Sequence, residues 1–203
     1  MKLSSRERQR QIMEVSLGII KDGGIQSLTI KTISAKIGIS EQAIYRHFES
    51  KHHILISIID YFEECFKEVF KKPERPVTPL QQIKLMTSAH LQYFAGHPAV
   101  AAVIFSEEIF QNHSELAAAV RKSLDKRVEN LTTLIDKGQQ NGEINNAISA
   151  ENLALVLLGT MRLLITRWRI SGFTFDVEEK GKIIVADVLT LLHQQNHRNL
   201  KTG

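Results

Sequence analysis

A chain of 203 residues, 43% hydrophobic and 24% charged, is long enough to bury a sizeable core and has the composition of an ordinary globular protein. Its one cysteine, Cys65, excludes an internal disulfide framework and is typical of a protein of the reducing cytoplasm. The amino end has no apolar run of signal-peptide type, and the most apolar stretch, residues 153–165, is too short to cross a bilayer. We therefore predict a cytoplasmic protein without a membrane partner.

The net charge of +4 lies entirely in the first quarter of the chain. Residues 1–56 contain nine Lys/Arg and five Asp/Glu, whereas the remaining 147 residues contain seventeen of each. Such an asymmetry favours a polyanionic partner for the amino-terminal segment. The alternative is a solvated surface with a few surplus lysines, which the charge count alone does not distinguish.

Three helical segments are predicted before residue 50. Apolar spacing predicts a helix over residues 6–22, which ends at a Gly-Gly pair. Thr29 then caps a short helix that Gly38 closes. After a brief turn, Ser40 caps a second short helix that runs to Phe48. Two short helices joined by a turn with glycine at its start are typical of a helix-turn-helix, although short capped helices also occur in ordinary bundles.

The rest of the chain is predicted to be helical as well. Ser50 caps a longer helix that runs to about residue 70, and three prolines between residues 71 and 79 mark a linker, because they exclude a regular helix. Further helices are predicted over residues 79–95, 98–110, 112–140, 149–170 and 176–193. The fold class is therefore all-α.

The first segment also carries a specific order of residue types. A glycine precedes a Thr-capped helix, a Gly-apolar-Ser turn follows, and a short helix ends in Tyr-x-His-Phe before Ser-Lys. In this chain the three parts are Gly24–Thr29, Ile33–Ser40 and Ile44–Lys51. The pattern resembles the TetR family of transcriptional regulators, and the resemblance covers residues 6–56.

The resemblance implies an all-helical dimer with two domains. Residues 1–56 would form a three-helix helix-turn-helix domain, and residues 57–203 a larger helical domain for effector binding and dimerisation. The helix over residues 51–70 joins the two domains, so it is the element expected to transmit a change from one to the other. DNA and effector would then weaken each other's binding by the same factor, because coupling between two sites is reciprocal.

In a helix-turn-helix, the second helix presents its amino-terminal residues to base edges in the major groove. The resemblance adds contacts, mostly to phosphates, at the end of that helix, at the next helix start and at the start of the supporting helix. The expected DNA contacts are Thr29, Lys31, Ser40, Glu41, Gln42, Ala43, Tyr45, Arg46, His47 and Lys51.

The recognition helix departs from the family pattern at its first two positions. Many members have a basic residue and then a small one, where this chain has Glu41 and Gln42. Gln42 can pair with adenine, and Glu41 can accept from a cytosine amino group. Alternatively, Glu41 stabilises the helix amino end, and Tyr45 and Phe48 serve partly in packing. The operator preference of relatives is therefore not transferable.

The last two helices are expected to form a homodimer. The helix over residues 149–170 is apolar nearly all round, and one face inside a small domain cannot use all of that surface. The resemblance implies a four-helix bundle, in which residues 149–170 and 176–193 pair with the same helices of a second copy. The alternative is a large intramolecular core.

The larger domain is also expected to bind a small apolar or amphipathic effector. Arg162 lies inside an apolar helix and needs a partner if it is buried, either Glu107, Glu108 or the anionic group of an effector. Alternatively, it reaches solvent at the rim of the dimer. Together with the likeness of residues 91–142 to acyl-thioester-responsive family members, an anionic partner for Arg162 favours an acyl thioester or a fatty acid. Core packing is the alternative at each position. The candidate lining residues are Phe62, Phe66, Met86, His90, Phe94, Ile104, Phe110, Leu124, Arg162 and Trp168.

Together these features predict a repressor that binds double-stranded DNA at a palindromic operator and is released by its effector. The sequence has no phosphate-binding loop, nucleophile elbow or zinc-ligand spacing, so we do not expect an enzyme, a cofactor or a metal site. His52 and His53 are adjacent and point apart. The alternative function is a helical adaptor that senses a small molecule without binding DNA.

Overall fold

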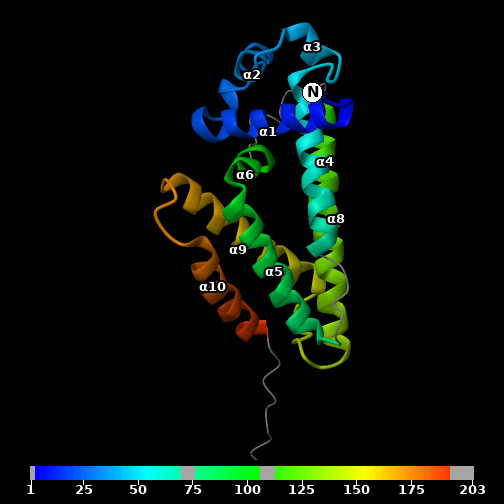
Figure 1. Cartoon of the computed structure of the whole chain (residues 1–203). Helices are drawn as coiled ribbons and strands as arrows, with labels where there is room; N and C mark the ends of the chain where they lie inside the picture. Colours follow the sequence, from blue (N-terminus) through cyan, green and yellow to red (C-terminus); the bar gives the residue numbers. More distant parts are fainter. Residues whose placement is uncertain (1–2, 70–75, 106–112, 193–203) are drawn as a thin grey trace, which may run out of the picture. The chain divides into compact units, whose positions relative to one another are not determined.

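The computed structural model describes residues 3–69, 76–105 and 113–192. Every regular element in these ranges is helical, in agreement with the predicted all-α class (Figure 1). None of the described helices has an apolar stretch long enough to span a membrane.

The chain divides into two compact units. Unit 1 consists of residues 1–70 and 93–124, and unit 2 of residues 71–92 and 125–203. The predicted domain boundary between residues 56 and 57 falls inside a helix and stays a prediction.

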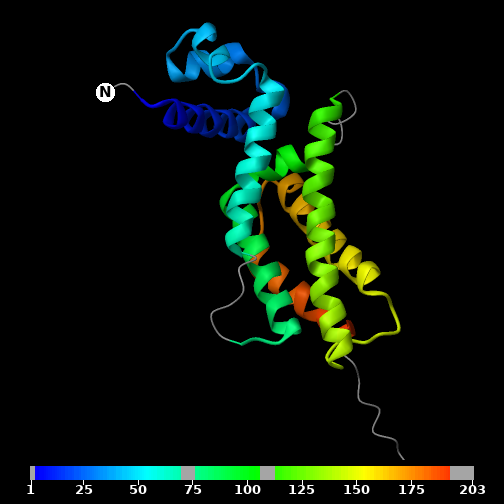
Figure 2. The same ribbon diagram turned by 90° about the vertical axis from the view of Figure 1, so that its right-hand side faces the viewer.

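Unit 1 is built around the helix-turn-helix. Its helices are α1 (Ser5–Gly23), the short 3-10 helix η1 (Ile25–Ser27), α2 (Ile30–Ile37), α3 (Glu41–Tyr45), α4 (Lys51–Val69), the last turn of α5 (Pro79–Gly96), α6 (Pro98–Ile104) and the first part of α8 (Ser114–Gln140). Both views show the short helices α2 and α3 next to each other, above α1 and beside the first turn of α4 (Figures 1 and 2).

A single apolar cluster holds unit 1 together. Ile12 of α1, Ile33 of α2, Ile44 of α3 and Ile54 of α4 are each fully buried in it. Leu116 at the start of α8 belongs to the same cluster. Each such side chain contributes about 1.5–3 kcal/mol when it leaves water. The two short helices are therefore positioned by α1 and α4 rather than by their own length.

Unit 2 contains the remaining helices. They are the first part of α5 (Pro79–Gly96), the second part of α8, α9 (Ala150–Ile170) and α10 (Val177–Leu192). α10 packs closely on its neighbours at Gly181, where an added methyl group would overlap Leu91 of α5 and come within 3.2 Å of Leu164 Cδ2 of α9. Glycine therefore permits the close approach of three helices there.

Two helix ends differ from the sequence prediction. α3 ends at Tyr45 instead of Phe48, because the chain turns at Arg46 and the Phe48 ring enters the core of unit 1. α6 ends at Ile104 instead of residue 110, since Phe105 leaves helical geometry with φ −102° and ψ 9°. Residues 106–112 lie outside the described ranges.

Candidate DNA interface and effector region

The start of α2 is stabilised by local hydrogen bonds. The Thr29 hydroxyl accepts from the Thr32 amide at 3.0 Å, and the Thr32 hydroxyl accepts from the Thr29 amide at 3.0 Å. This reciprocal cap satisfies two amide groups that the helix itself leaves open. The predicted cap at Thr29 is thus confirmed, and Lys31 in the first turn is exposed.

The turn between α2 and α3 depends on Gly38. Its φ of 78° and ψ of 36° lie in the left-handed region, and its N–H donates to the Ser34 carbonyl at 2.9 Å. The amide of Ile39 donates to the same carbonyl at 3.1 Å. Only glycine adopts this conformation without a Cβ penalty, so Gly38 sets the direction in which α3 leaves α2.

The recognition helix α3 separates buried from exposed side chains within five residues. The Ser40 hydroxyl caps it by accepting from the Ala43 amide at 3.2 Å. Ile44 is fully buried, whereas Glu41 and Gln42 are exposed and the Tyr45 side chain is 53% exposed. The exposed polar residues at the helix start are therefore available to base edges, and Tyr45 does not serve as core packing.

Polar contacts link α1 to the segment that follows α3 and to α2. The imidazole Nδ1 of His47 lies 3.3 Å from the Ser5 hydroxyl. On α2, the Lys36 ammonium lies 3.4 Å from an Asp22 carboxylate oxygen. Arg46 is exposed, and Lys51 is half-buried in the first turn of α4. The ten predicted DNA contacts thus lie within one short stretch of unit 1, and their roles stay predictions.

The predicted effector residues fall in both units. In unit 1, Phe62 and Phe94 are buried with ring centroids 5.3 Å apart, and Phe94 lies 5.5 Å from the Phe105 ring. Ile104 is buried and Leu124 is partly buried against the core of the same unit. These residues therefore form apolar packing around the second half of α4.

In unit 2, Met86, His90 and Trp168 are buried, and Arg162 is half-buried. The Trp168 ring meets the Phe173 ring edge-on at 4.7 Å. Phe110 lies outside the described residues, and the side chain of Phe66 is not described. The structure brings Phe62 and Phe94 together, whereas the pocket as a whole stays a prediction.

Sequence reasoning missed a buried cation in α8. Arg127 is only 5% exposed and lies in the same helical stripe as Leu131 and Ile135. Its guanidinium also acts on His90, whose pKa falls to about 3 because burial disfavours the charged imidazole and Arg127 repels it. The spacing that identified the apolar stripe of this helix includes position 127, so the signal was present in the sequence.

Both α9 and α10 carry exposed apolar side chains. On α9 the exposed fractions are 52% for Val156, 62% for Leu163 and 81% for Ile170, which are spaced seven residues apart. On α10, Ile183 is 58% exposed and Leu191 is 81% exposed. An aligned apolar surface of this kind is typical of an interface with another chain.

Comparison with known proteins identifies the class. The family model of bacterial regulatory proteins of the tetR family matches residues 12–58, and the model of the tetracyclin repressor-like C-terminal domain matches residues 76–179, about half of the chain. The chain belongs to the TetR family. It is a DNA-binding transcriptional regulator, and the ligand-responsive repressor that the resemblance implied is supported by its relatives.

Two relatives resemble this chain over most of its length. The fatty acid metabolism regulator protein of Bacillus subtilis is 22% identical over 194 residues, covering 94% of this chain and 98% of the relative. Nucleoid occlusion factor SlmA of Actinobacillus pleuropneumoniae is 26% identical over 61% of this chain and 62% of its own length.

Solved structures show the same fold. The transcriptional regulator FadR from Bacillus subtilis, in complex with stearoyl-CoA, superposes with a TM-score of 0.78 at 20% identity, covering 91% of this chain and 99% of that one. The fatty acid degradation regulator FadR from Bacillus halodurans superposes with a TM-score of 0.77 at 19% identity, with the same coverage.

Proposed function

We propose that this regulator reads operator DNA through the amino-terminal end of α3 and the first turn of α4. The observation that supports it most is the exposed, polar start of α3, with Glu41 and Gln42 held outward by a buried Ile44. This helix lies in the quarter of the chain that carries the entire net positive charge. Phosphate contacts from Arg46 and Lys51 would supply affinity, and base contacts would supply specificity.

The proposed assembly is a homodimer through α9 and α10. The exposed apolar line at Val156, Leu163 and Ile170 supports it, because a single copy leaves these side chains in water. Pairing α9 and α10 with the same helices of a second copy would bury that line and match the two-fold symmetry of a palindromic operator.

The proposed effector is an acyl thioester or a fatty acid. Support comes from the relative named as a fatty acid metabolism regulator and from the similar structure that holds stearoyl-CoA. In unit 2 of this chain, the buried apolar side chains of Met86 and Trp168 suit an acyl chain, and Arg162 is the candidate partner of an anionic group. Arg127, buried in α8, is a second candidate for that role.

DNA binding is tested with genomic fragments enriched by the purified protein. Binding to the enriched site should weaken steeply as salt rises, and the variant Tyr45→Ala/Lys51→Ala should lose most of it. Each lost phosphate contact should lower the slope of the logarithm of affinity against the logarithm of salt concentration by about 1. A dimer without Lys51 should therefore show a slope lower by about 2. Lys36→Ala is the matched control, since its charge faces Asp22. Salt-independent behaviour on every fragment would instead favour the adaptor function.

The effector is tested by release of that DNA. Saturated acyl thioesters of increasing chain length should release it, whereas the free thiol carrier should not. The release of DNA by acyl thioesters should be compared between the unmodified chain and each of the variants Arg162→Gln and Arg127→Met. Thermal unfolding checks that the variants remain folded. Release by an uncharged hydrocarbon alcohol as effectively as by the thioester would exclude the anionic effector class.

A further inference from the structure

Three histidines meet where α4 begins and α8 begins, within unit 1. His52 and His53 lie in the first turn of α4, and His113 directly precedes α8. The imidazole rings of His52 and His113 have their centroids 3.4 Å apart, at an interplanar angle of 35°. The two adjacent histidines of α4 thus face different partners, and one partner lies 61 residues away along the chain.

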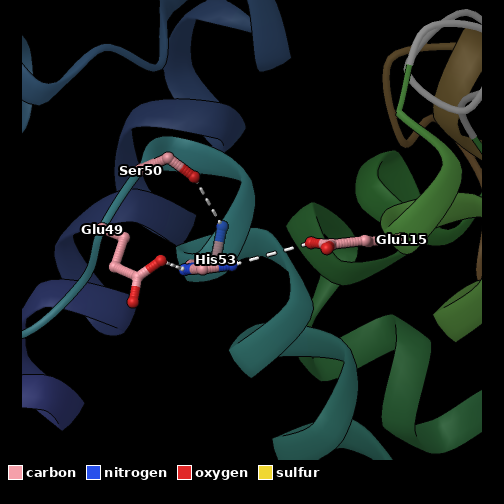
Figure 3. A network of polar contacts seen from close by, with 4 residues as sticks. All are labelled: Glu49, Ser50, His53 and Glu115. Carbon is pink, nitrogen blue, oxygen red and sulfur yellow. Dashed lines mark hydrogen bonds and ion pairs between the residues drawn. The ribbon is translucent and has the colours of Figure 1, made fainter.

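The second histidine of α4 is placed between two carboxylates. His53 Nδ1 lies 3.5 Å from Glu49, and its Nε2 lies 3.7 Å from Glu115 of α8 (Figure 3). The amide of His53 donates to the Ser50 hydroxyl at 3.2 Å, which caps α4. Both carboxylates are largely exposed, so each ion pair contributes little by itself.

The three histidines and Glu115 line a polar cleft with a volume of about 240 Å³, bounded by the first turns of α4 and α8. The described charged or titratable groups next to His52 are His113, Lys51 and His53. Glu49 and Glu115 lie beside His53. The described residues contain no set of ligands that could hold a metal ion. The titratable side chains of the cleft therefore lie between two helix starts.

We propose that the ring contact between His52 and His113 is a proton-sensitive latch, which holds the start of α8 on α4 at neutral pH and opens when both rings become charged. Two like charges at a ring separation of 3.4 Å repel each other even in water. The closed contact is therefore compatible with at most one charged ring.

The surroundings of His52 favour the closed contact only while the ring is neutral. Its pKa is lowered from the ordinary value because of burial first, and then because of His113, Lys51 and His53. A histidine whose pKa is lowered in the folded state contributes stability above its ordinary pKa near 6.5, and that contribution is lost as the pH falls below this value. The latch is therefore closed above about pH 6.5 and opens as the pH falls below this value.

Opening acts on the DNA interface through α4, a step that rests on the proposed DNA-binding function. Lys51, a proposed phosphate contact, lies in the same helical turn as His52, and the recognition helix ends only six residues earlier, at Tyr45. A first turn that is no longer held by α8 would not keep these groups in one position. Acidification should therefore weaken operator binding.

The full-length chain can be tested directly, in buffer with a metal chelator. Amide exchange is measured at pH 7.5 and 5.5, after correction for the intrinsic rates, at Ile54 and Ala117. These amides donate the first helical hydrogen bonds of α4 and α8, to Ser50 and His113. At pH 5.5 their protection should fall about five-fold or more, as expected for two like charges in contact in water.

The variants His52→Phe and His113→Phe keep an aromatic ring at the contact but cannot charge it, so both should retain protection at pH 5.5. His97→Phe is the matched control, because the His97 ring also contacts an aromatic ring in unit 1, that of Tyr93, with centroids 4.4 Å apart. That variant should open like the unmodified chain. Equal loss of protection in His52→Phe and the unmodified chain would overturn the latch, as would unchanged protection in both.

The coupling to DNA is measured in parallel at constant ionic strength. Between pH 7.5 and 5.5 the operator affinity of the unmodified chain should fall about five-fold relative to that of His52→Phe. An equal change in both proteins would overturn the coupling. If neither protein binds operator at pH 7.5, the proposed function fails instead, and the exchange experiment still decides the latch.

Discussion

The helix-turn-helix and the α9–α10 pair differ in how completely one chain buries their apolar side chains. The first is completed inside one chain, since caps at Thr29 and Ser40 and the buried side chains Ile33 and Ile44 stabilise two helices of eight and five residues. α9, with 21 residues, leaves Leu163 at 62% exposure. A short helix can thus be completed inside one chain, while a long one can leave large apolar side chains exposed to water.

The largest expected effect comes from placing a charge on the open face of α9. Leu163→Glu would bury a carboxylate without a partner in the proposed four-helix interface, so the dimer dissociation constant should rise a hundredfold or more, about 3 kcal/mol. Sedimentation equilibrium measures the change, and operator binding should fall with it.

Leu85→Glu provides the matched control for the dimer experiment. Leu85 is 55% exposed on α5, so it is equally apolar and equally open to water, but it lies outside the proposed interface. A dimer that persists in Leu163→Glu, or that is lost equally in Leu85→Glu, would exclude α9 as the pairing surface.

Unit 2 should lose stability in acid because of one buried histidine of α5. Buried His90 in unit 2 has a pKa of about 3, so the folded state binds fewer protons than the unfolded state between this value and 6.5. Its contribution to stability is fully present above pH 6.5 and is lost as the pH falls. From pH 7 to pH 4.5 the loss attributable to His90 is about 2–3 kcal/mol.

Denaturant unfolding at both pH values measures this contribution. His90→Gln removes the titrating group and should reduce the pH dependence by that amount. The exposed His97 is the control position, and His97→Gln should leave the pH dependence as it is. An unchanged dependence in His90→Gln would show that this imidazole is not held neutral.

The smallest of the expected effects compares two glycines of unit 1. Gly38→Ala places a Cβ on a left-handed residue and should lower the free energy of unfolding by about 1–2 kcal/mol. Gly18→Ala is the opposite case, because Gly18 lies inside α1 with no atom within 4 Å of an added methyl group. That variant should be more stable by about 0.5–1 kcal/mol. Chemical unfolding of both variants measures the changes in the free energy of unfolding. Changes of the same sign in the two variants would contradict the role of Gly38 in the α2–α3 turn.

Local signals predicted much of the fold. The caps at Thr29, Ser40 and Ser50 were predicted from residue type and are confirmed by hydrogen bonds that each hydroxyl accepts from the amide three residues further along. Capping and apolar spacing act over one or two helical turns, so a sequence contains all that they require.

The candidate sites were less accessible to sequence reasoning. The DNA-contact residues lie within one short stretch, so they could be proposed together, although Glu41 and Gln42 leave the operator open. The ten effector residues are scattered over 107 positions, and the structure brings Phe62 and Phe94 into contact. Arg127 was missed because a charged residue was not expected inside an apolar stripe.

By itself, the sequence determined the helical class, the order of the helices, the capped turn at Gly38 and the family. Each of these depends on residues that are near one another along the chain. Only the tertiary structure decided that His52 contacts His113, that Arg127 is buried beside His90, and that Leu163 faces outward on α9. Those outcomes depend on which distant segments share a surface, and burial against a distant partner leaves no periodic signal in the local sequence.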